Sequence, residues 1–110
     1  MEKVIIRKDY SKINTFERED YIYTKYAESD NYILWRVYRD IESWRPAWDK
    51  YELWKKVYVK NPDGTRVVRK LRDEDGGKNL WFFNNFDDFK HYLDRFPNKF
   101  PEEVSQFCHQ

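Results

Sequence analysis

The stretch KYELWKKVYVKNPDGTRVVRKLR, residues 50–72, decides the fold, because it predicts a β-hairpin. In NPDGT, residues 61–65, Asn, Pro and Asp suit the successive positions of a type I turn, and Gly64 suits the next position, where φ is positive. The segments on either side are rich in Val, Tyr and Trp and alternate with a period of two residues, which is typical of strands. The sequence therefore predicts two antiparallel strands joined by this turn.

Strand patterns also occur at residues 20–28, 31–40 and 78–84, since β-branched and aromatic side chains favour a pleated, half-buried surface. A first strand is expected at residues 3–8. Residues 10–19 fit a loop or a short helix, and their pattern does not choose between the two.

Alternation within the strands predicts which side chains are buried. Trp35 alternates with Ile33 and Val37, so its indole is predicted to lie in the core. In the strand at residues 78–84 both faces are apolar, which is typical of a central strand covered on both sides. Its two faces hold Leu80 with Phe82 and Trp81 with Phe83.

The pattern changes to that of a helix in NFDDFKHYLDRF, residues 85–96. The apolar residues recur at intervals of three and four, on one face of an α-helix: Phe86, Phe89, Leu93 and Phe96. Asn85 suits the N-cap, and the two aspartates that follow lie in the positive first turn. Pro97 ends the helix, and a short final helix is expected from Pro101.

Strands joined by short turns and followed by helices predict an α+β fold. We expect a single domain, residues 1–110, with an antiparallel sheet of about five strands. A C-terminal helix packs on one face, and the pattern allows a short second helix there. The other face needs a further cover, from residues 10–19, from the loop that carries Trp44 and Trp48, or from another protein.

The composition indicates a folded protein with an unusual core. Charged residues make up 37% of the chain, but aromatic residues make up 20%, and disordered segments are poor in aromatics. With 5 Trp, 9 Tyr and 8 Phe, some aromatic side chains are expected to serve a contact beyond the core. Cys108 is the only cysteine, which favours a reducing compartment, and no segment approaches membrane-spanning length. We expect a cytoplasmic location and no membrane partner.

Positive charge is concentrated in the hairpin. The formal net charge is +1, but residues 55–72 hold seven Lys or Arg residues and the single acidic residue Asp63. The turn predicts the register of the two strands, in which Lys60 lies opposite Arg66 and Lys56 lies opposite Lys70. Like charges across a ladder are destabilising, unless an anion or a nearby carboxylate lies between them.

The same register assigns the hairpin side chains to two faces. One face is expected to pack against the helix and holds Val57, Val59, Val67 and Leu71. The other face combines aromatic and basic residues, as single-stranded nucleic acid sites do. Its candidate binding residues are Trp54, Lys56, Tyr58, Lys60, Arg66, Lys70 and Arg72. The alternative is a solvated structural face, because Lys and Arg also protect exposed strands from aggregation.

Trp44 and Trp48 are secondary binding candidates. They bracket Pro46 in an expected loop, where they either close one end of the core or line a ligand pocket.

No residue pattern indicates catalysis. Glu52 and Lys55 are three residues apart, which places them on opposite faces of a strand, so they do not form a nuclease-type pair. Asp88 and His91 read as an ion pair on a helix surface. The sequence predicts no catalytic residue, no metal ligand and no cofactor.

The sequence favours two function classes, and a third, an enzyme, would need residues that the fold brings together from distant parts of the chain. The leading hypothesis is a small non-enzymatic binding module that contacts another protein, or a second copy of itself, through an aromatic-rich sheet surface. The alternative is a module that binds single-stranded nucleic acid through the basic, aromatic hairpin at residues 54–72.

Overall fold

A computed structural model describes residues 10–18, 20–39, 49–60, 62–64, 66–69 and 80–109, and for residues 49, 57–60 and 66–69 it describes the backbone. The strand expected at residues 3–8 lies outside the described residues. In the described part of the chain, no helix has the length and apolar character that a membrane crossing would need.

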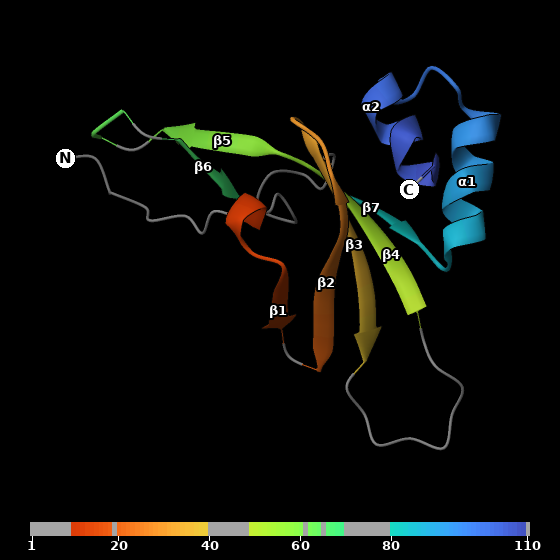
Figure 1. Cartoon of the computed structure of the whole chain (residues 1–110), viewed down its shortest axis with the longest axis horizontal. Coiled ribbons are helices and arrows are strands. Elements are labelled where there is room, and N and C mark those ends of the chain that lie inside the picture. The colour runs from red at the N-terminus through yellow and green to blue at the C-terminus, as the bar shows by residue number, and fades with distance from the viewer. Residues whose placement is uncertain are drawn as a thin grey trace.

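The centre of the fold is an antiparallel sheet of five strands in the order β1-β2-β3-β4-β7, with the helices on one side (Figure 1). This confirms the predicted α+β class. The sheet strands are β1 (Thr15–Arg18), β2 (Tyr21–Glu28), β3 (Tyr32–Arg39), β4 (Asp49–Lys55) and β7 (Leu80–Phe83). The remaining elements are β5 (Val57–Lys60), β6 (Arg66–Arg69), α1 (Phe86–Arg95), α2 (Glu102–Ser105), and two 3-10 helices, η1 (Tyr10–Lys12) and η3 (Gln106–His109).

The hairpin around Gly64 forms as predicted, but it is shorter. β5 pairs with β6 in the predicted register, with Val59 opposite Val67, and Gly64 has a φ of 89°. The expected single strand before the turn divides at Lys56, whose backbone N–H donates to the carbonyl of Asn31 at 2.7 Å. β4 therefore belongs to the five-stranded sheet, and β5–β6 is a separate two-stranded sheet.

The prediction that this hairpin packs against the helix is wrong. β5 and β6 extend away from the five-stranded sheet on the side opposite α1 and α2, and β6 lies close to η1 (Figure 1). The helices pack instead on the face of the five-stranded sheet, which β4 joins by pairing with β3 and β7.

Residues 10–18 contain both a short helix and a strand. η1 is followed by β1, which pairs with β2 and places Phe16 opposite Tyr23. The strand was not predicted, because its sequence TFER has a single apolar residue and so shows little alternation. β2 in turn has a bulge between Lys25 and Ala27.

The C-terminal helices follow the sequence prediction closely. The side chain of Asn85 accepts a hydrogen bond from the backbone N–H of Asp88 at 2.8 Å, so the predicted N-cap is confirmed. α1 ends at Arg95, and Phe96, the last residue of the predicted apolar face, is 44% exposed. Pro101 is the N-cap of α2 rather than its first residue.

The sheet has two buried faces. The helix face packs against α1, α2 and η3, and its sheet residues are Ala27, Tyr32, Leu34, Tyr51, Leu53 and Phe83. The tryptophan face lies on the other side, and its apolar residues are Tyr23, Ile33, Trp35, Val37, Trp54 and Leu80. Trp35 is fully buried, which confirms its predicted place in the core.

The tryptophan face is covered by the chain itself. Phe16 stacks on Tyr23 with ring centroids 4.5 Å apart and also contacts the rings of Trp35 and Trp54. The ring of Tyr10 lies 5.0 Å from that of Trp54. Of the three covers considered from the sequence, the structure shows the first, through Tyr10 and Phe16.

β7 lies at an edge of the sheet rather than at its centre. Among the described residues it pairs with β4 alone. Phe82 is 58% exposed, so the prediction of a central strand covered on both faces is wrong. Apolar residues on both faces of a strand also fit an edge strand with one exposed aromatic ring.

Candidate functional site

Trp54 does not lie on an exposed basic face. It is 2% exposed in β4, opposite Ile33 and Leu80, and its Nε1–H donates to Oε1 of Glu52 at 3.0 Å. The prediction of an exposed Trp54 is therefore wrong. The alternation was read correctly, but the face that it describes is buried by β1 and η1.

Lys56 does not lie on a solvent-facing basic surface either. Its side chain is 7% exposed and its Nζ lies 2.6 Å from Oε2 of Glu28. A carboxylate from the end of β2 therefore neutralises this lysine. Lys70, which was expected opposite Lys56, lies outside the described residues.

The binding role of the other hairpin residues stays a prediction. Tyr58, Lys60 and Arg66 lie on the paired strands β5 and β6, with Lys60 opposite Arg66 as predicted. Arg72 and the secondary candidates Trp44 and Trp48 lie outside the described residues. The nucleic-acid hypothesis stays a prediction, without Trp54 as its stacking ring.

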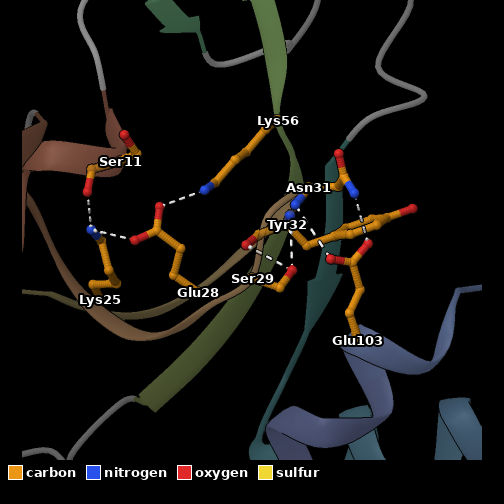
Figure 2. A network of polar contacts seen from close by, with 8 residues as sticks. All are labelled: Ser11, Lys25, Glu28, Ser29, Asn31, Tyr32, Lys56 and Glu103. Atoms are coloured by element: carbon orange, nitrogen blue, oxygen red, sulfur yellow. Dashed lines mark hydrogen bonds and ion pairs between the residues drawn. The ribbon is translucent and has the colours of Figure 1, made fainter.

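The structure brings together a group of charged residues that the sequence analysis did not connect. We call it the Glu28 cluster, and it consists of Glu28, Lys25 and Lys56 (Figure 2). The Nζ of Lys25 lies 3.3 Å from Oε1 of Glu28 and donates to the backbone carbonyl of Ser11 at 2.6 Å. The two lysines thus hold opposite oxygens of one carboxylate.

The cluster is close to the tryptophan face. The side chain of Lys25 is 11% exposed, and its ammonium lies 5.8 Å from the ring centroid of Trp35. Lys56 stands where β4 ends and β5 begins. The cluster therefore ties η1, the end of β2 and the base of the hairpin together.

The turn between β2 and β3 is fixed by a second set of polar contacts (Figure 2). The backbone N–H and the side-chain Nδ2 of Asn31 donate to the Glu103 carboxylate at 3.3 and 3.1 Å. The backbone N–H of Tyr32 donates to Oγ of Ser29 at 3.1 Å. Burial, and then the nearby charge of Glu103, raise the pKa of Tyr32 above its ordinary value.

Glu52 is a buried carboxylate in the middle of the tryptophan face. It is 4% exposed, and it accepts hydrogen bonds from the hydroxyl of Tyr23 at 2.7 Å and from the indole of Trp54. Burying a charge is costly unless it is hydrogen-bonded, and these donors meet part of that cost. The indole N–H of Trp35, also fully buried, has no hydrogen-bond acceptor in the described part of the chain.

Sequence reasoning missed this carboxylate because it considered Glu52 only with Lys55, on the opposite face. The signal was present, since Glu52 alternates with Trp54 and so lies on the same face of the strand. In the described ranges, no group of three or more His, Cys, Asp or Glu residues is placed to hold a metal ion.

The two edges of the sheet differ in character. β1 has the sequence TFER, and its Glu17 and Arg18 are exposed charged residues of the kind that protect an edge from pairing with another chain. β7 has the sequence LWFF and carries no charge. Its Phe82 lies on the tryptophan-face side, opposite Glu52, and is 58% exposed.

Comparison of the chain with protein-family models, with curated proteins and with solved structures found no match.

Proposed function

We propose that this protein is a small, non-enzymatic binding module that contacts another protein through the β7 edge of its sheet. The observation that carries the proposal is the 58% exposure of Phe82 on an edge strand without charged residues. A cytoplasmic location is part of the proposal and is supported by the single cysteine.

The aromatic-rich sheet surface expected from the sequence is narrowed to this edge because the rings on the tryptophan face are buried against one another. Phe16, Tyr23, Trp35 and Trp54 pack on one another on the tryptophan face. The helix face is covered by α1 and α2. Of the large apolar side chains in the described residues, Phe82 is the most exposed.

An edge strand also offers backbone groups to a partner. In an antiparallel pair, alternate residues direct their N–H and C=O groups away from the neighbouring strand. β7 pairs with β4 over Leu80–Phe83, so its alternate residues direct these groups outward. An extended segment that adds beside β7 would bind through main-chain hydrogen bonds, with an apolar side chain against Phe82.

Selection of displayed random peptides against the purified protein tests this proposal. Apolar, extended peptides should be enriched, and their binding should protect β7 amides from hydrogen exchange. Phe82→Lys should weaken the binding of the selected peptides by about tenfold or more, because it removes an exposed aromatic anchor and adds a charge.

Phe96→Lys is the matched control, because Phe96 is also an exposed phenylalanine but lies at the end of α1. It should leave peptide affinity within about twofold of the wild type, since an exposed substitution away from the contact has a small effect. Peptides that bind Phe82→Lys as tightly as the wild type, or that protect amides elsewhere, would refute the proposal.

A further inference from the structure

The Glu28 cluster has an unequal number of positive and negative groups. Lys25 and Lys56 contribute two ammonium groups, and Glu28 contributes one carboxylate. In the described part of the chain no second carboxylate pairs with either lysine. The lysine side chains are 11% and 7% exposed, while that of Glu28 is 27% exposed. The cluster is therefore a nearly buried site with one excess positive charge.

The hydrogen-bond capacity of the lysines points the same way. An ammonium group has three N–H donors. Lys25 uses two of them, on Glu28 and on the carbonyl of Ser11, whereas Lys56 has the Glu28 carboxylate as its acceptor. Buried charges are ordinarily paired and hydrogen-bonded. An anion with more acceptor oxygens or more charge than one carboxylate would therefore satisfy the two lysines more fully than Glu28 does.

The geometry indicates which anion suits the site. Glu28 bridges the two ammonium groups with its two oxygens (Figure 2). A phosphate group also presents two or more oxygens from one centre, and a phosphate monoester carries a charge of about −1.5 to −2 at neutral pH. Glu28 is the most exposed member of the cluster and precedes a turn, so its side chain is the one placed to move aside.

The position of the cluster is also suitable for an anion. Lys56 lies at the base of the β5–β6 hairpin, whose paired positions Lys60 and Arg66 add further positive charge. A phosphate at Lys56 would therefore lie at one end of the basic stretch.

We propose that Lys25 and Lys56 form a phosphate-binding site in which Glu28 occupies the anion's place until the ligand displaces it. The ligand is either a free phosphate or phosphate ester, or the phosphodiester backbone of a nucleic acid. This site is independent of the β7 edge.

Titration of the full-length protein with inorganic phosphate tests the site. The side-chain 15Nζ resonances of Lys25 and Lys56 should shift with phosphate concentration, and that of Lys99 should not. Lys56→Met should weaken phosphate binding about tenfold or more, because it removes a charged donor. Glu28→Gln should strengthen binding several-fold, because it removes the competing carboxylate while keeping a side chain of the same shape.

Lys99→Met is the matched control, because Lys99 is an exposed lysine in the turn between α1 and α2. The proposal is overturned if Lys56→Met binds phosphate as well as Lys99→Met does, or if Glu28→Gln binds more weakly than the wild type. Should Lys56→Met fail to fold, the wild-type resonances decide alone, and unshifted Lys25 and Lys56 signals overturn the proposal.

A fluorescent single-stranded oligonucleotide and its uncharged methylphosphonate analogue distinguish the two sources of phosphate. If the ligand is a nucleic acid, the charged oligonucleotide should bind more tightly than phosphate. The logarithm of its affinity should fall linearly with the logarithm of the salt concentration, and Lys56→Met should weaken its binding. A free phosphate ligand predicts phosphate binding with no Lys56-dependent binding of the oligonucleotide. Failure of both ligands to bind at low salt overturns the proposal. Phe82→Lys should leave phosphate binding unchanged, which separates this test from that of the β7 edge.

Discussion

Trp54→Phe and Trp35→Phe form a matched pair that measures the hydrogen bond to the buried carboxylate. Both indoles are buried on the tryptophan face, with ring centroids 5.3 Å apart. Both substitutions remove the same atoms and leave a similar space. Only the indole of Trp54 donates to Glu52, whereas the indole N–H of Trp35 has no acceptor in the described residues.

The difference between the two variants follows from that contrast. A hydrogen bond to a charged group contributes about 1.5–3 kcal/mol, and its loss leaves an acceptor less satisfied. Trp35→Phe gives up no such bond and removes a buried donor that has no acceptor among the described residues. The loss of packing is common to both and largely cancels. Trp54→Phe should therefore lower the free energy of unfolding by about 1.5–3 kcal/mol more than Trp35→Phe does.

Urea unfolding followed by far-ultraviolet circular dichroism is the suitable assay, because tryptophan fluorescence changes with the substitutions themselves. The slope of the free energy of unfolding against urea concentration should be the same for both variants. When both substitutions are made in a Glu52→Gln background, the difference between their free energies of unfolding should fall to about 0.5–1.5 kcal/mol, which is the contribution of a neutral hydrogen bond. Equal costs for the two substitutions, or a difference that persists unchanged with Glu52→Gln, would refute the reasoning.

Two further predictions concern the helix cap and alkaline pH. Asn85→Ala should destabilise the protein by about 1 kcal/mol in a urea melt, because the cap of α1 loses its hydrogen bond to Asp88; a cost near zero would show that the cap does not contribute. Burial raises the pKa of Cys108 from its ordinary 9.0 and, together with the charge of Glu103, that of Tyr32 from 10.0. The unfolded chain therefore ionises first as the pH rises. The stability that these neutral groups contribute is present below about pH 9 and is lost as the pH rises through 9–10 toward the folded-state pKa values. Urea midpoints measured between pH 8 and 11 should fall, and less so in Tyr32→Phe; a flat profile would contradict this.

The local elements of this protein could be predicted from the sequence, because their signals lie within a few residues. Asn85 and the spacing of Phe89 and Leu93 place α1. Gly64 and the residues before it set the register of β5 and β6, and the structure has that register. Alternation also placed Trp35 in the core.

The tertiary structure alone decided what covers each face. Alternation placed Trp54 and Lys56 on one face of a strand but carries no information about which distant strand lies beside it. β4 pairs with β3 and β7, and Phe16 and Tyr10 cover the indoles. These partners are far away in the sequence, and their pairing depends on the total apolar surface that the chain buries.

The Glu28 cluster is a similar case. The excess of Lys and Arg at residues 55–72 is evident in the sequence, and so is the possibility that a carboxylate relieves it. The carboxylate is Glu28, which Lys25 shares. This pairing depends on where β2 ends and on where the strand before the turn divides at Lys56. The sequence by itself determined β2, β3, β7, the turn around Gly64 and the helix α1, since side-chain alternation, turn chemistry and helix capping are local signals. Only the tertiary structure decided which charges meet and which rings are buried, since both depend on contacts between segments that are distant along the chain.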